Sequence, residues 1–149
     1  MNHTMASNGR IGVAVMGQGR SGYNIHVRCM GDVESVTEKF VVVAVADALV
    51  RHAAVVEELG FKVYGDWRRL LSAGGFDMVV NSLHAPLHVD ATIEALKSGF
   101  HVFFEKSLAK KVADVDRILD AEHKSGKILF PFQQNRLQPF CSDPPEAFS

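Results

Sequence analysis

The sequence has little that ties it to a secreted, membrane-spanning or nucleic-acid-binding protein. Only two of its 149 residues are cysteine, which excludes a disulfide framework and favours a reducing, cytoplasmic location. No apolar run approaches the ~20 residues of a transmembrane helix, and the polar residues 1–9 lack the apolar core of a secretory signal. A net charge of −1 gives no electrostatic reason to bind nucleic acid or an anionic membrane.

The composition that is present is that of an ordinary globular protein, with 47% hydrophobic and 22% charged residues. A chain of this length can bury ~68–70% of its unfolded surface, which is enough for one domain with a core. We predict a disordered N-terminus over residues 1–9 and one folded domain over residues 10–137. Residues 138–149 contain three prolines and no periodic apolar spacing, so we predict an irregular tail there.

The strongest motif is a short apolar run that leads directly into a glycine-rich turn. The run from Ile11 to Val15 has the length of a buried strand, and Gly17-x-Gly19-x-x-Gly22 follows it. Apolar residues then recur at the spacing of one helix face, at Tyr23, Val27 and Met30. The segment therefore predicts a strand, a tight turn and a helix in succession.

Glycine is needed at each of the three positions of this turn for a different reason. Gly17 permits the tight turn, Gly19 lets a pyrophosphate approach the backbone, and Gly22 lets the helix pack close to the strand. Free N–H groups and the helix dipole then face the phosphates. We predict a dinucleotide-binding turn over residues 17–22, which includes Gln18, Arg20 and Ser21. A glycine motif alone also occurs in turns that bind nothing, and Arg20 could equally be solvated.

A carboxylate directly after the second predicted strand strengthens the dinucleotide interpretation. The apolar run Phe40 to Ala46 ends in Asp47, where an acidic side chain can bond the adenosine ribose hydroxyls and repel a 2′-phosphate. This predicts NAD rather than NADP, although Arg51 could soften the preference. Gly22 and Asp47 are 25 residues apart, slightly more than the usual ~20. We expect the polar segment 31–35 to form a loop that takes up the extra length.

The rest of the chain alternates between strand and helix patterns. This alternation predicts an α/β fold, a doubly wound and mostly parallel sheet with helices on both faces and strand order 3-2-1-4-5-6. Further strands are expected at 62–64, 78–81, 101–104 and 127–132, and helices at 51–59, 66–71, from Pro86 to Gly99, and from Val112 up to Gly126.

Short motifs recur along this whole pattern. In order they are the glycine motif with His26 after it, Asp47, Glu57-Glu58-Leu59-Gly60, Tyr64-x-Asp66, Asp77-x-Val79-Val80, His88, Ala95-Leu96-x-x-Gly99-x-His101-Val102, Glu105-Lys106-x-Leu108-Ala109, and Asn135-Arg136-x-Gln138-Pro139. Their order and spacing resemble the cofactor-binding half of the Gfo/Idh/MocA oxidoreductases, the group that includes inositol dehydrogenases and glucose–fructose oxidoreductase. The resemblance covers about residues 10–140.

The resemblance implies an NAD(P)-dependent oxidoreductase that moves a hydride between a sugar or polyol carbon and the nicotinamide. Lys106 corresponds to the lysine of the family's Glu-Lys-Pro motif, which orients the substrate oxygen and assists proton transfer. A lysine at the carboxyl end of a strand also lies where open α/β sheets bind ligands; a solvated surface lysine is the alternative. The resemblance further places Glu105 and the loop residues Ser82, Leu83, His84 and His88 at the cofactor.

Other residues are given simpler interpretations. His84 and His88 are four residues apart, but Pro86 lies between them and no third ligand is close, so we predict no metal site. His26 is as well explained by packing as by catalysis. Trp67, near a predicted helix start, is expected to pack in the core.

Three features depart from the family pattern. The family's second domain, which supplies most of the substrate pocket and often the homo-oligomer interface, is expected after the sixth strand, yet only residues 137–149 follow Arg136. Ser107 stands where the motif has a proline that often follows a cis bond. Lys106 is therefore expected either to precede a cis bond or to point differently from the family geometry. His84 replaces a loop proline.

Three hypotheses follow for a chain of this kind. It is an oxidoreductase subunit whose other half is supplied separately, an NAD(H)-binding module without activity of its own, or a truncated remnant. In the first two cases the dinucleotide is the expected ligand, whereas the remnant is expected to fold poorly. A sugar or polyol is the expected substrate once a second domain is supplied, and the chain alone is expected to be inactive.

Overall fold

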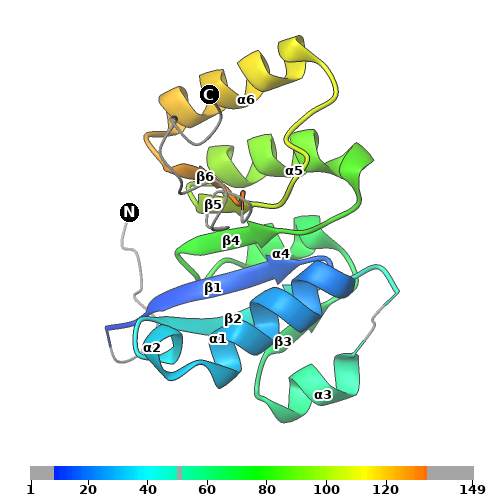
Figure 1. Cartoon of the computed structure of the whole chain (residues 1–149), viewed down its shortest axis with the longest axis vertical. Coiled ribbons are helices and arrows are strands. Elements are labelled where there is room, and N and C mark those ends of the chain that lie inside the picture. Colours follow the sequence, from blue (N-terminus) through cyan, green and yellow to red (C-terminus); the bar gives the residue numbers. More distant parts are fainter. Residues whose placement is uncertain (1–8, 50–51, 134–149) are drawn as a thin grey trace, which may run out of the picture.

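The computed structural model describes residues 9–49 and 52–133, in which six parallel strands form one sheet. Their order, β3-β2-β1-β4-β5-β6, confirms the predicted doubly wound α/β fold and its strand order. Figure 1 shows the strands one above another across the view, with α1 in front of the sheet and α4 behind it. The strands are β1 (Ile11–Met16), β2 (Phe40–Ala46), β3 (Lys62–Tyr64), β4 (Met78–Asn81), β5 (His101–Phe104) and β6 (Leu129–Pro131).

Helical segments connect successive strands. The chain has a π-helical segment η1 (Gly22–Val27), followed by α1 (Arg28–Asp32), α2 (Glu34–Thr37), α3 (Ala53–Glu58), α4 (Trp67–Ala73), α5 (Ala85–Lys97) and α6 (Val112–Ser125). Helices α5 and α6 pack against each other on one side of the sheet, whereas α1 lies on the opposite side (Figure 1). No helix in the described ranges has the length and apolarity to cross a membrane.

The central strand β1 explains why the sheet holds together. Its side chains alternate between two buried clusters because successive residues of a strand face opposite sides. Val13 and Val15 pack with Val27 of η1 on one face. Ala14 and Met16 join the cluster on the other face, which α4 and α5 cover. All four are fully buried, which is the reason that β1 is a continuous apolar run rather than an alternating one.

The segment between the glycine turn and β2 corrects two predictions. Residues 31–35 do not form a loop, because α1 runs to Asp32 and the short helix α2 follows directly after Val33. The predicted face of the first helix packs against the core, with Val27 buried and Tyr23 and Met30 half-buried, but the helix begins with a π-helical rather than an α-helical segment. Its π-helical start is wider than an α-helix, and the residues buried there are Gly22, His26 and Val27.

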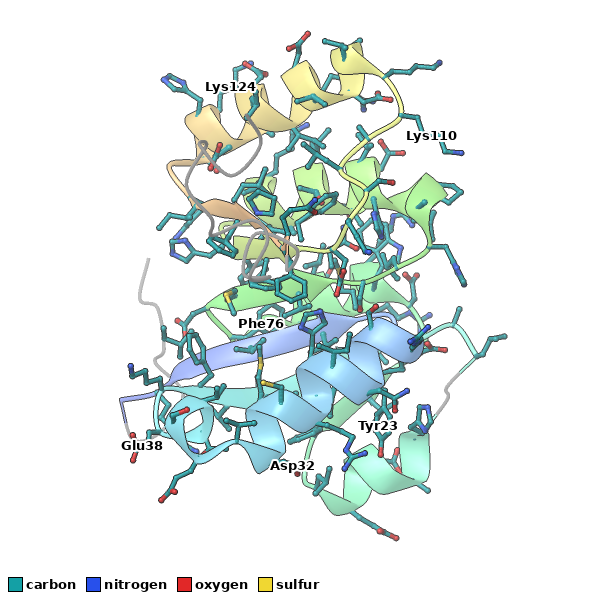
Figure 2. All side chains as sticks on the ribbon, in the orientation of Figure 1. Tyr23, Asp32, Glu38, Phe76, Lys110 and Lys124 are labelled. Atoms are coloured by element: carbon teal, nitrogen blue, oxygen red, sulfur yellow. The ribbon has the colours of Figure 1, made fainter. Side chains whose placement is uncertain are left out.

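Helix α3 also departs from its predicted face. The predicted helix over residues 51–59 was expected to have His52 and Leu59 on its apolar stripe, but Leu59 is 59% exposed. His52, just before the helix, has a positive φ of 60°. Its ring stacks on Tyr23, with 3.8 Å between ring centroids, where Tyr23 lies between the first helix and α3 (Figure 2). The predicted start of this helix at residue 51 lies outside the described residues, as do the predicted N-terminal and C-terminal tails, apart from Gly9.

Helix α4 begins with a side-chain cap at Asp66. The Asp66 carboxylate accepts the Arg68 backbone N–H at 2.9 Å, and the helix then buries Trp67, Leu70 and Leu71. The prediction that Trp67 packs in the core is confirmed, since it is 7% exposed.

This cap leads to the first test. Asp66→Ala is expected to lower the free energy of unfolding by about 1 kcal/mol, because the N–H of Arg68 loses its acceptor. Urea denaturation measures the change. Asp120→Ala is a matched control: that carboxylate forms only an exposed pair with Lys124 on α6, so about 0.5 kcal/mol or less is expected. Equal losses in the two variants would contradict the capping role.

Candidate functional site

The carboxyl ends of the parallel strands bring most of the predicted site residues to one edge of the sheet, as in other open α/β folds. A cleft of about 460 Å³ opens there between the ends of β1, β2 and β4 and the start of α4. It is lined by Gly17, Gly19, Ala46, Asp47, Ala48, Leu49, Gly65, Asp66, Trp67, Arg68, Ser82, Leu83, His84 and Leu87. The glycine turn, Asp47 and the loop after β4, predicted from separate motifs, therefore share one cleft.

The glycine turn is held too tightly for side chains at two of its positions. Gly17 has φ of 89°, and a Cβ there would lie 2.5 Å from the Ser82 carbonyl oxygen. A Cβ at Gly22 would lie 1.7 Å from the Gly17 carbonyl oxygen. These approaches agree with the predicted roles of a tight turn and of close packing by the helix. Gly19 lines the cleft, whereas the neighbouring Arg20 is exposed and is absent from its lining.

Asp47 is buried and ties this turn to the end of β2. One of its oxygens, Oδ2, accepts the Gln18 N–H at 2.7 Å, and the other, Oδ1, accepts the Leu49 N–H at 2.9 Å. A fixed negative charge therefore stands beside the cleft, at the end of β2 where a ribose is bound in folds of this kind.

Gln18 presents a buried polar atom that lacks a partner. Its side chain is 1% exposed, and its Nε2 donates only a long bond, 3.4 Å, to the Gly17 carbonyl oxygen. No group in the described part of the chain donates to its Oε1. A buried acceptor without a donor is costly. A bound ligand or an ordered water beside the turn would supply the missing donor, which fits a dinucleotide at this position.

The loop after β4 is fixed by two side chains, one of which the sequence analysis did not single out. Asn81 is fully buried; its Nδ2 donates to the His88 carbonyl oxygen and to Thr92 Oγ1, and its Oδ1 accepts the Leu83 N–H. The Ser82 hydroxyl lies 2.9 Å and 3.0 Å from the carbonyl oxygens of Met16 and Gly17. A polar residue at the end of an apolar strand was the available signal for Asn81.

His88 lies in a different element from the one expected. It is in the first turn of α5 rather than in the loop, it is 3% exposed, and it is not among the residues that line the cleft. Its Nε2 is 2.6 Å from the Leu83 carbonyl oxygen and its Nδ1 is 3.2 Å from that of Ser107. His84 is exposed, and no group of three or more potential metal ligands gathers within the described ranges.

The end of β5 carries the remaining predicted residues. Glu105 is 5% exposed and its Oε1 is 2.7 Å from His26 Nε2, so its side chain faces the first helix rather than the cleft. Lys106 is exposed. The Lys106–Ser107 peptide bond is cis, the first of the two arrangements expected. Ser21 is half-buried and does not line the cleft.

The strand order, the glycine turn after β1 and the buried carboxylate after β2 together define a dinucleotide-binding Rossmann domain. The chain belongs to the GFO_IDH_MocA family, described as an oxidoreductase family with an NAD-binding Rossmann fold, whose family model matches residues 11–133. The resemblance drawn from the short motifs is confirmed.

Named relatives agree with this membership. Inositol 2-dehydrogenase of Salmonella paratyphi B is 30% identical over 122 residues, which are 80% of this chain and 34% of the relative. The enzyme of the same name from Streptomyces avermitilis is 33% identical over 121 residues, with the same two shares. The WlbA dehydrogenase of Chromobacterium violaceum, solved with NADH and UDP-GlcNAcA, superposes with a TM-score of 0.76 at 28% identity, over 89% of this chain and 37% of that one. The chain thus spans about a third of the length of these relatives.

Proposed function

We propose that the chain is the cofactor-binding half of an NAD-dependent oxidoreductase that oxidises or reduces a CH–OH group of a sugar or polyol. The observation that carries the proposal is the convergence of the glycine turn, Asp47 and the loop after β4 on one cleft in a chain of this family. The relatives support the substrate class, since they include inositol dehydrogenases and an enzyme solved with a UDP-sugar.

Different residues of the cleft would bind different parts of the cofactor. N–H groups of the turn Gly17–Gly22 would bind the pyrophosphate. Asp47 would bind the adenosine ribose and repel the 2′-phosphate of NADP, which makes NAD the preferred cofactor. NAD, when bound, supplies the carbon that accepts the hydride. The chain's own contribution to the chemistry is Lys106: its amine would hold the substrate hydroxyl and take its proton as the carbonyl forms.

A titration tests the binding half of the proposal. Saturable quenching or enhancement of NADH fluorescence by the 149-residue chain is expected, with weaker binding of NADPH. A folded chain that binds neither would contradict the proposal.

A chimaera tests the substrate class and Lys106. Joining this chain to the part of the Salmonella paratyphi B inositol 2-dehydrogenase that lies outside the matched residues is expected to give NAD-dependent oxidation of inositol. Lys106→Met should lower the turnover by about 10²- to 10⁴-fold without weakening NADH binding, because a general acid–base group is lost. Lys97→Met, an exposed residue at the end of α5, is the matched control. Unchanged turnover in Lys106→Met would contradict the assigned role.

A second candidate function is a dinucleotide-binding module without activity of its own. The observation in its favour is that the residues lining the cleft are those assigned to the cofactor, and Lys106 is not among them. NADH binding together with an inactive chimaera, correctly assembled, would favour this candidate.

A further inference from the structure

The structure leaves the side chain of Lys106 exposed but fixes both of its neighbours. None of the hydrogen bonds or ion pairs found in the described ranges involves the Lys106 ammonium. Glu105, directly before it, is buried with its carboxylate bonded, and the carbonyl oxygen of Ser107, directly after it, is bonded as well. The position of Lys106 at the end of β5 is therefore determined by what holds residues 105 and 107.

His26 contacts Glu105, the residue directly before Lys106. Its Nε2 lies 2.7 Å from Glu105 Oε1, and the side chains of the pair are only 5% and 7% exposed. The rings of Phe103 and Phe132 meet the imidazole edge-on, with centroids 5.4 Å and 5.7 Å away, which restricts its orientation. His26 lies on η1, the helix that leaves the glycine turn, so Glu105 is joined to the phosphate side of the cleft.

His88 holds the second neighbour from a different element. Its Nδ1 faces the Ser107 carbonyl oxygen at 3.2 Å, while its Nε2 faces the Leu83 carbonyl oxygen at 2.6 Å. Phe104 contacts the ring edge-on, with 5.2 Å between centroids. Both partners are carbonyl oxygens, which only accept, so a neutral imidazole donates to one of them and an imidazolium donates to both. In either form the ring lies between the loop after β4, where Leu83 lines the cleft, and the turn that follows Lys106.

We propose that His26 and His88 are positioning residues, a histidine clamp that sets where Lys106 stands relative to the bound dinucleotide. The inference rests on the proposed function. Packing alone does not require two buried imidazoles, because apolar rings would fill the same space without the cost of burying polar atoms. Both imidazoles bond the same three-residue segment, and they approach it from the two segments that border the cleft.

The test follows Lys106 by NMR in the full 149-residue chain, with lysines converted to ¹³C-dimethyl-lysine. The Lys106 signal is assigned by its absence in Lys106→Arg. Saturating NADH is expected to shift this signal in the wild-type chain. His26→Phe and His88→Phe keep a ring of similar size but remove the hydrogen bonds. In each, the NADH-induced shift of Lys106 should fall by at least half, measured at saturation so that a change in affinity has no effect.

Two comparisons separate positioning from general stability. His123→Phe, on the exposed side of α6, is the matched control and should leave the shift unchanged. Glu105→Gln retains an acceptor for His26 and should keep most of the shift, whereas Glu105→Leu should lose it. This pair also tests the His26 contact if His26→Phe does not fold. Thermal unfolding confirms that each variant is folded at the temperature of the measurement.

The outcomes distinguish the two proposals. If NADH changes no signal of the wild-type chain, the proposed function fails and the clamp fails with it. If NADH binds and the Lys106 shift stays full in His26→Phe, His88→Phe and Glu105→Leu, the clamp is overturned and the proposed function stands.

Discussion

Gly22→Ala is expected to destabilise the chain more than any other single methyl addition at a glycine whose surroundings are described. The new Cβ would lie 1.7 Å from the Gly17 carbonyl oxygen and 2.6 Å from Ser82 Oγ. The nearer atom belongs to the backbone, so relief requires the turn itself to move. We expect a loss of about 3 kcal/mol or more in the free energy of unfolding, a large part of the ~5–15 kcal/mol that holds a domain together. NADH binding should be lost in any fraction that stays folded.

Urea denaturation and an NADH titration measure both effects. Gly31→Ala is the matched control, because Gly31 lies in α1 and a Cβ there meets no atom within 4 Å. Since alanine is the better helix former, this variant is expected to gain up to ~1 kcal/mol. If Gly22→Ala were as stable as the wild-type chain, the close approach of the helix to the turn would be wrong.

Replacing Asp47 by asparagine is expected to change the choice of cofactor. The substitution removes the negative charge but keeps one oxygen that can accept the N–H of Gln18 or of Leu49. Hydrogen bonds to a charged group contribute ~1.5–3 kcal/mol, so NADH binding should weaken roughly 10- to 100-fold. NADPH should lose less, because the repulsion of its 2′-phosphate disappears.

The ratio of the two dissociation constants is the decisive measurement. Asp66→Asn is the matched control: Asp66 lines the same cleft, and asparagine caps a helix as well as aspartate does. It removes one negative charge from the cleft without touching the end of β2, so the ratio should stay within about twofold. An unchanged ratio in Asp47→Asn would remove Asp47 from the ribose contact.

The parts of the site that directly follow an apolar run in the sequence were predictable. The glycine turn and Asp47 each follow an apolar strand, and parallel strands end at the same edge of the sheet. The partners of Glu105 and His88 were not predictable in this way. The Glu105–His26 contact joins residues 79 apart, and its existence depends on how η1 packs beside β5. Local patterns in the sequence contain no information on that packing.

The spacing of apolar residues was also insufficient to predict every residue that the first helix buries. Apolar residues at i, i+4 and i+7 favoured an ordinary α-helix with Tyr23, Val27 and Met30 inside. All three residues do pack against the core, with Val27 buried and Tyr23 and Met30 half-buried, but the polar His26 is buried as well and the pattern gave no sign of it. A histidine is a weak signal of burial, so the bond to Glu105 became visible only in three dimensions.

The π-helical start of the first helix constrains how this chain can change in length. Its buried residues, Gly22, His26 and Val27, follow the wider repeat of a π-helix. Deleting one residue between Gly22 and His26 would break this repeat and change which side chain stands at the buried position of His26. The imidazole of His26 would then no longer meet Glu105. Insertions and deletions in homologous chains should therefore avoid Gly22–Val27 and collect instead around Val33, where the chain leaves one helix and starts the next.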